Sequence, residues 1–187
     1  MLSVIIATLN SERVLVPTLA ALVPGATEGL ISDVYFADGG SHDETAAVAD
    51  IAGCHLLTPD GPLGRRLRTA AAAARAPWLL FLRPGTVLDS SWIGETRRFI
   101  EHGFGEPRAA VYRRAAPGQP ALRDALSLFV AALGGRPRPE QGLLIARALY
   151  DRIGGHSETA SDPEGDLLRR IGRRRIARLA ATAVAAR

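Results

Sequence analysis

The first 90 residues alternate between short apolar runs and helix-like segments. Leu2 to Ala7 is a continuous apolar run, typical of a strand buried on both faces of a parallel sheet. Comparable runs predict strands at 34–37, 54–57 and 78–82, with helices between them at about 11–23, 41–52 and 64–76. Strand–helix units repeated at this spacing predict an α/β fold, in which a mostly parallel central sheet has helices on both faces.

Capping and breaking residues indicate where these helices begin and end. Asn10 or Ser11 can cap the first helix, and Pro24, which a glycine follows, is expected to end it. Two capping boxes predict later helix starts, one at Ser41 (Ser-His-Asp-Glu) and one at Ser161 (Ser-Asp-Pro-Glu).

The second half is less regular. Helices are predicted at 90–102 and 122–133, strands at 110–113 and 142–145, and a short helix ending near residue 153. The helix from Ser161 carries Leu167, Leu168 and Ile171 on one face. The tail, 173–187, stays ambiguous, because its alanine content favours a helix but its place after an α/β unit favours a strand. No repeat or linker divides the chain, so 1–187 is predicted to be one domain.

Composition excludes several kinds of chemistry. The chain has 187 residues, 47% hydrophobic and 22% charged, as expected of a globular protein with a sizeable core. Its 23 Lys and Arg residues are all arginine, which excludes a Schiff-base lysine, a P-loop lysine and a kinase lysine. The single Cys54 excludes an intrachain disulfide and a cysteine-rich zinc site. The four histidines form no HExxH pair, so a zincin is excluded too.

The net charge of +4 has two interpretations. The arginine excess reflects either a compositional bias of the source genome or an anionic partner, and the bias accounts better for the total count. No signal peptide is expected, because no basic segment precedes the first apolar run. No membrane span is expected either, because the longest weakly apolar stretch, 69–82, is short and contains Arg75 and Pro77. We therefore expect a cytoplasmic protein.

Candidate ligand-binding residues follow the predicted strands. In open parallel sheets, ligands bind beyond the carboxyl ends of the strands, where the strand order reverses. The polar residues found there are Thr8 and Asn10, the run Asp38-Gly39-Gly40-Ser41, and Arg83. Gly40 lets the backbone approach a ligand closely, and Asp38 can accept hydrogen bonds from a ribose or a base. The same run is also compatible with a tight turn that binds nothing.

The strongest functional signal is the order of five segments. They are SVIIATLNSE (3–12), YFADGGSHDET (35–45), GPLGRRLRTAAAAARAPWLLFLRPGTVL (61–88), EQGLLIARALYDRIGG (140–155) and DPEGDLLRRIGR (162–173). In this order they resemble the family-2 glycosyltransferases with the GT-A fold, which transfer a sugar from a nucleotide-sugar donor. The resemblance covers most of the chain but is poor at 103–139. It implies one GT-A-like (Rossmann-like) domain, with a nucleotide-binding half at 1–90 and an acceptor-side half at 91–187.

The resemblance implies a role for each matching residue. Thr8, Asn10 and Glu12 stand where the family's first-strand loop holds the nucleotide, and Asp38 matches an aspartate that contacts the uracil or ribose. Arg65 and Arg68 lie on the helix that faces the nucleotide, although asparagine is more usual at Arg68. Glu140 and Gln141 match an acidic-Gln pair on the acceptor side.

The chain departs from the family at the metal site. After the fourth strand the family usually has D-x-D or a single late aspartate, which binds the divalent metal that bridges the diphosphate. Here the segment is Phe-Leu-Arg83-Pro-Gly, and a guanidinium repels Mg²⁺ and Mn²⁺. We therefore predict that the usual metal site is lost. Asp89 is a poorly placed substitute that is better explained as a helix cap.

The second departure concerns the catalytic base. The family usually places Glu-Asp at the start of a late helix, where the aspartate deprotonates the acceptor hydroxyl. Here Pro163 and Glu164 occupy those positions, with Asp166 two residues on. Glu164 is equally well explained as a residue of the Ser161 capping box, and Asp162 is a further candidate if the register slips.

Two functions therefore remain open. The first is a metal-independent glycosyltransferase, in which Arg83, with Arg68 or Arg65, stabilises the leaving diphosphate and Glu164 acts as the base. The second is a non-catalytic nucleotide-binding relative that keeps the fold. The expected partner is a nucleotide-sugar, with a lipid-linked or small-molecule acceptor, and no further cofactor is predicted.

The arginines between residues 169 and 178 allow a third interpretation, a patch for nucleic acid or anionic lipid. A charge run on a helix is usually a solvated face, and no nucleic-acid fold signature accompanies it, so no nucleic-acid partner is predicted. Lipid attraction is more plausible, since many relatives act on lipid-linked acceptors at the cytoplasmic membrane face. A peripheral contact with the inner membrane face therefore remains an open alternative.

Overall fold

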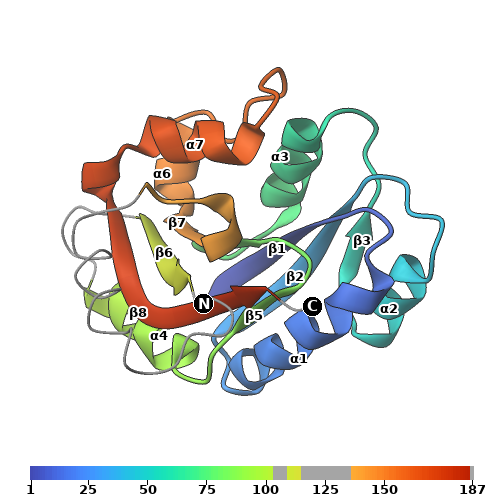
Figure 1. Cartoon of the computed structure of the whole chain (residues 1–187), viewed down its shortest axis with the longest axis horizontal. Coiled ribbons are helices and arrows are strands. Elements are labelled where there is room, and N and C mark those ends of the chain that lie inside the picture. The colour runs from blue at the N-terminus through green and yellow to red at the C-terminus, as the bar shows by residue number, and fades with distance from the viewer. Residues whose placement is uncertain (103–108, 115–135, 186–187) are drawn as a thin grey trace.

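A computed structural model describes residues 1–102, 109–114 and 136–185. Its centre is one eight-stranded sheet in the order β3-β2-β1-β4-β7-β6-β8-β5 (Figure 1). The strands are β1 (Leu2–Thr8), β2 (Ile31–Asp38), β3 (His55–Leu57), β4 (Trp78–Leu82), β5 (Thr86–Leu88), β6 (Ala109–Arg114), β7 (Leu143–Ala146) and β8 (Ile176–Ala185). The helices are α1 (Glu12–Thr27), α2 (Thr45–Ile51), α3 (Leu63–Ala73), α4 (Trp92–His102), α6 (Arg147–Arg152) and α7 (Pro163–Ile171), with 3-10 turns η2 (Pro139–Gln141) and η3 (Arg173–Arg175).

The first four strands form a parallel unit, as the apolar runs predict. β1 pairs in parallel with β2 on one side and with β4 on the other, and β2 pairs in parallel with β3. Residues from the middle of these strands, such as Val4, Phe36 and Leu80, are completely buried. β4 has the predicted bounds, and the other three strands overlap theirs. This part of the prediction is confirmed.

The remaining strands show that the expectation of a mostly parallel sheet is wrong. β7 is antiparallel to both β4 and β6, and β5 is antiparallel to β8, whereas β6 and β8 are parallel. A parallel neighbour is normally reached by a strand–helix–strand crossover, and β7 does not follow β4 in that way. The sheet is therefore mixed.

The ambiguous tail forms the long strand β8 as far as Ala185. It bends along the edge of the sheet (Figure 1), pairing with β6 and then with β5. Its buried side chains include Leu179, Ala181 and Ala183, spaced two residues apart as on one face of a strand. Pairing with two strands has overridden the helical preference of its alanines. The three-residue β5, which the sequence did not predict, is its partner.

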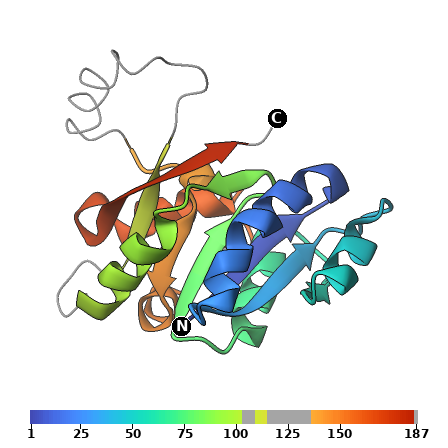
Figure 2. The ribbon, with the colours of Figure 1, turned by 90° about the horizontal axis from the view of Figure 1, so that it is seen from below.

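Helices cover both faces of the sheet, as predicted (Figure 2). One buried cluster joins α1, α2 and α4 to one face, and it includes Leu15, Ala49 and Trp92. The other joins α3, α6 and α7 to the opposite face, and it includes Leu67 and Leu149. The three predicted core residues of α7, namely Leu167, Leu168 and Ile171, all belong to this second cluster.

Three predicted helix boundaries are wrong. α1 continues through Pro24 to Thr27, and Gly25 lies directly against the Trp92 ring, where a Cβ would be 2.6 Å from ring carbons. α2 begins at Thr45, because the Ser41 hydroxyl accepts from the Asn10 backbone and donates to Asp38 instead of capping a helix. α7 is capped by Asp162, which accepts a hydrogen bond from the backbone of Gly165. Trp92 is buried in the core.

The helix predicted at 122–133 lies outside the described residues. Within the part of the chain that the structure describes, no helix is long and apolar enough to cross a membrane.

Candidate active site

The strand order reverses at β1. The chain runs from β1 to β2 and β3 on one side of the sheet, and then returns to place β4 on the other side. Ile6 pairs with Leu82, so Arg83 leaves the end of β4 beside the end of β1. This edge is where an open parallel sheet binds its ligands.

Arg83 is held there by two carboxylates from the second half of the chain. Its Nε and Nη2 donate to Glu164 Oε2 at 2.8 and 2.6 Å, and its Nη1 donates to Glu140 Oε1 at 2.8 Å. The side chain of Glu164 is 14% exposed, whereas those of Arg83 and Glu140 are 38% and 44% exposed. We call these three residues the Arg83 cluster. The structure thus brings together both predicted catalytic residues and one predicted acceptor-side residue.

Arg83 stays positively charged in this cluster. Burial lowers the pKa of the guanidinium, but the hydrogen bonds and charge of Glu164, with the charges of Glu140 and Asp162, outweigh burial and raise the pKa above its ordinary value. The cluster therefore combines one fixed cation with two carboxylates.

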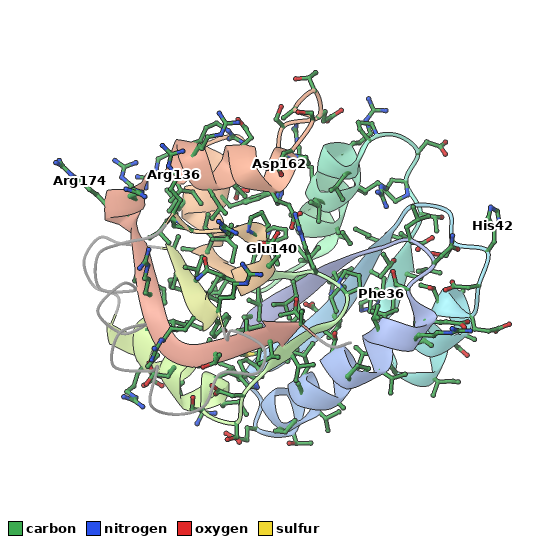
Figure 3. All side chains as sticks on the ribbon, in the orientation of Figure 1. Phe36, His42, Arg136, Glu140, Asp162 and Arg174 are labelled. Carbon is green, nitrogen blue, oxygen red and sulfur yellow. The ribbon has the colours of Figure 1, made fainter. Side chains whose placement is uncertain are left out.

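Local structure explains how the two glutamates reach Arg83. Glu164 lies in the first turn of α7, and because Asp162 supplies the cap, the Glu164 carboxylate is turned to Arg83. Glu140 lies in η2, which its neighbour Gln141 anchors by donating to the Tyr112 carbonyl and accepting from the Arg138 backbone. Asp162, at the start of α7, and Glu140 are labelled in Figure 3.

A second polar group lies at the ends of β1 and β2. The two Asp38 oxygens accept four hydrogen bonds from their own surroundings: Thr8 Oγ1 and Ser41 Oγ donate to Oδ1, and the backbones of Gly40 and Ser41 donate to Oδ2. Burial raises the pKa of this carboxyl, but the hydrogen bonds from Ser41, Thr8 and Gly40 outweigh burial and hold the pKa below its usual value. We call residues 38–45 the Asp38 loop.

Asn10 and Glu12 fasten the Asp38 loop to α1. Asn10 has a left-handed backbone (φ 47°), and its side-chain oxygen accepts from the backbone of His42 at 2.8 Å. Glu12 Oε2 accepts from the backbone of Glu44 at 2.9 Å. His42 is exposed, far across the view from Glu140 in Figure 3. Thr8, Asn10, Glu12, Asp38 and Gly40 thus form one network, all of it predicted to bind the nucleotide.

The three arginines of α3 do not all bind the same partner. Arg65 and Arg68 both pair with Glu158, at 2.8 and 3.3 Å. Arg66 instead donates to the carbonyls of Thr8 and Ala37, at the ends of β1 and β2. Sequence reasoning missed Arg66 and Glu158, because contacts across 58 and 93 residues leave no local signal.

The loop that carries Glu158 rests on a buried polar pair. The Tyr150 hydroxyl lies 2.9 Å from His156 Nδ1, and the two rings lie beside Phe81 of β4. Burial, together with the charge of Arg170, lowers the pKa of His156 to about 3, so this imidazole is neutral near pH 7. The loop also lies directly against Gly64, where a Cβ would meet the Ser157 carbonyl.

The residues at the end of β4 do not fit a divalent metal. Mg²⁺ and Mn²⁺ need several oxygen ligands, and the two nearest glutamates already bind a guanidinium. Within 1–102, 109–114 and 136–185, no three His, Cys, Asp or Glu side chains form a metal-binding group. Asp89 is occupied elsewhere, since it accepts from Ser91 and from the backbone of Thr182.

Solved structures share this fold. Glucosyl-3-phosphoglycerate synthase from Mycobacterium tuberculosis, in complex with Mn²⁺, UDP and glucosyl-3-phosphoglycerate, superposes with a TM-score of 0.72 at 17% identity, covering 100% of this chain and 72% of that one. The same synthase with Mn²⁺ and UDP-glucose gives 0.73 at 19% identity, covering 100% and 70%. S. aureus TarS 1–349 gives 0.73 at 17% identity, covering 99% and 60%.

These neighbours are GT-A glycosyltransferases, so the predicted GT-A fold is confirmed. Neither a protein-family model nor a curated protein matches the sequence. At these identities the likeness establishes the fold and not the activity.

Proposed function

We propose that this protein is a glycosyltransferase that moves a sugar from a nucleotide-sugar donor to an acceptor hydroxyl without a metal. The observation that carries the proposal is the Arg83 cluster, in which a fixed cation and a carboxylate lie together at the strand-order reversal of a GT-A fold. The nucleotide-binding half is 1–90, and 91–187 supplies the acceptor side.

The donor lies along the ends of β1, β2 and β4. Thr8, Asn10, Glu12, Asp38 and Gly40 form the wall that receives the nucleoside. Because the Asp38 oxygens are saturated by their own chain, Asp38 acts mainly by fixing the shape of this wall. Arg65 and Arg68 bind the diphosphate in this proposal, which their position on α3 supports.

In the chemical step Glu164 takes the proton of the acceptor hydroxyl. The acceptor oxygen forms a bond to the anomeric carbon, and the bond from that carbon to the diphosphate oxygen breaks. The leaving diphosphate keeps the electron pair and is stabilised by Arg83, whose fork of N–H donors suits phosphate oxygens. Direct displacement gives inversion at the anomeric carbon.

The acceptor approaches from the side of Glu140 and Gln141. One neighbour was solved with phosphoglyceric acid, which supports a small anionic acceptor. A lipid-linked acceptor is the alternative, and it accords with the exposed arginines at the end of α7 and in η3, such as Arg169 and Arg174. On this proposal the protein is cytoplasmic and contacts the inner membrane face peripherally, which salt-sensitive binding to anionic vesicles would test.

Donor turnover in excess EDTA tests the metal-independent step. We expect hydrolysis or transfer of a UDP-sugar or GDP-sugar to continue in EDTA, and to fall about 100-fold or more in Arg83→Gln. Glu28→Gln, which changes an ion pair with Arg97 away from the site, is the control and should match the wild type. A requirement for added Mn²⁺ would refute the proposal.

A non-catalytic nucleotide-binding relative is the second candidate. The pairing of Arg83 with both glutamates supports it, because ion pairs within the chain are also what an inactive site would keep for stability. Calorimetric binding of a nucleotide-sugar, without turnover over a broad acceptor panel, is the result that would favour it.

A further inference from the structure

The arginines assigned to the diphosphate are already paired with glutamates. Arg83 binds Glu164 and Glu140, while Arg65 and Arg68 share Glu158. In every case the arginine comes from the nucleotide-binding half and the glutamate from residues 140–164. An anionic ligand at this site must therefore compete with carboxylates of the same chain.

The competition is sharpest at Arg83. A guanidinium presents five N–H donors in a planar fork, and its Nε–Nη2 edge is a pair of donors that can bind one anion. In Arg83 both donors of this edge point to a single oxygen, Glu164 Oε2. The Arg83 side chain is 38% exposed, so a ligand can still reach it. A phosphate that approaches this edge has to displace Glu164.

We propose that Arg83 is a latch on Glu164, which the diphosphate of the donor opens by taking over the guanidinium. This inference rests on the proposed function. Without donor, the Oε2 oxygen of Glu164 accepts two hydrogen bonds from Arg83, so its lone pairs are already engaged and an acceptor hydroxyl cannot bind there. Once the diphosphate holds Arg83, the Glu164 carboxylate is free to take the proton of the acceptor hydroxyl.

The latch has a chemical consequence beyond binding. The same arginine that releases the base then holds the diphosphate as the sugar–phosphate bond breaks, so the base becomes competent only when the leaving group is in place. Water and acceptor are thereby kept from an active base in the empty site. When the diphosphate departs, Glu164 returns to Arg83, and its proton passes to solvent.

Calorimetry with UDP in EDTA tests the latch, because a competitor's removal strengthens binding of the ligand. We expect Glu164→Gln to bind UDP about 3- to 10-fold more tightly than the wild type, since a neutral amide competes poorly for a guanidinium. Glu140→Gln should gain less, about 2-fold, because Glu140 makes one contact and is more exposed. Glu28→Gln, whose ion pair with Arg97 lies elsewhere, should bind as the wild type does.

A double variant shows whether the gain acts through Arg83. In the Arg83→Gln background, Glu164→Gln should add nothing to UDP affinity, which is the coupling that a double-mutant cycle detects. The latch is overturned if Glu164→Gln binds UDP no more tightly than the wild type while Arg83→Gln weakens binding, and the proposed function then stands. If UDP, GDP and pyrophosphate bind neither the wild type nor Glu164→Gln, the proposed function itself fails. UDP binding by Glu164→Gln, but not by the wild type, would support the latch.

Discussion

The Asp38 loop and the Arg83 cluster lie at the ends of β2 and β4, the two strands that flank β1, but the charges of the two regions are satisfied in opposite ways. Asp38 is 3% exposed and receives four hydrogen bonds, two of them from the backbone. Arg83 is 38% exposed and binds only side chains, which can move away. Buried hydrogen bonds to the backbone therefore fix the shape of one region, whereas partly exposed ion pairs leave room for a ligand in the other.

Removing the Asp38 carboxylate should destabilise the protein most. Asp38→Ala leaves two backbone N–H groups and two hydroxyls without their acceptor, and we expect it to lower the free energy of unfolding by about 3 kcal/mol. Asp38→Asn should lose less, because one amide oxygen can still accept. Urea unfolding measures both, and a loss below about 1 kcal/mol for Asp38→Ala would contradict the structural role.

His156 should make the loop before α7 sensitive to acid. Its pKa is about 3 in the folded protein against 6.5 ordinarily, so between these values the unfolded chain binds a proton that the folded chain does not. Stability should therefore fall as the pH drops through this window, by up to about 1.4 kcal/mol per pH unit. In His156→Gln the free energy of unfolding, measured by urea unfolding at several pH values, should depend less steeply on pH. An unchanged pH dependence would mean that His156 does not cause the loss of stability in acid.

Asn10 separates backbone strain from hydrogen bonding in the Asp38 loop. Asn10→Ala loses the bond to His42 and keeps a Cβ in the left-handed region, and we expect it to cost about 1 kcal/mol. Asn10→Gly loses the same bond but tolerates that backbone, so it should be the more stable of the two. Thermal unfolding compares them, and the reverse order would show that the conformation at residue 10 is not strained.

Arg83 should matter least for stability. Its ion pairs are partly solvated, so we expect Arg83→Gln to change the free energy of unfolding by less than about 1 kcal/mol. Urea unfolding checks this beside Asp38→Ala. A loss as large as that of Asp38→Ala would erase the contrast between the two regions and favour a purely structural cluster.

The sequence predicted the parts of the fold that local patterns determine. β4 was predicted to the residue, because an apolar run ends at a charged residue before Pro-Gly. The strands β5 and β8 were not predicted in this way. The three-residue β5 and the alanine-rich β8 form strands only because a partner strand lies beside each of them. Ser41 was assigned to a cap because the pattern fits one, but its hydroxyl accepts from the backbone of Asn10 and donates to Asp38 instead.

The candidate site was predictable only through the resemblance. It assigned Arg83 and Glu164 to one site, although 81 residues separate them, and the structure brings them into contact. It could not indicate that the two would bind each other, because an ion pair depends on side-chain directions that no motif encodes. The resemblance gave Arg66 and Glu158 no role, and only the folded chain shows their contacts.

Binding of UDP in the presence of EDTA tests whether Arg83 holds the diphosphate in place of a metal. Calorimetry should give the wild type the same affinity for UDP in EDTA as in Mn²⁺, while Arg83→Gln should bind about 100-fold more weakly under both conditions, with GDP run in parallel to cover the other donor base. Binding that appears only with Mn²⁺, or that Arg83→Gln leaves intact, would contradict this role of Arg83.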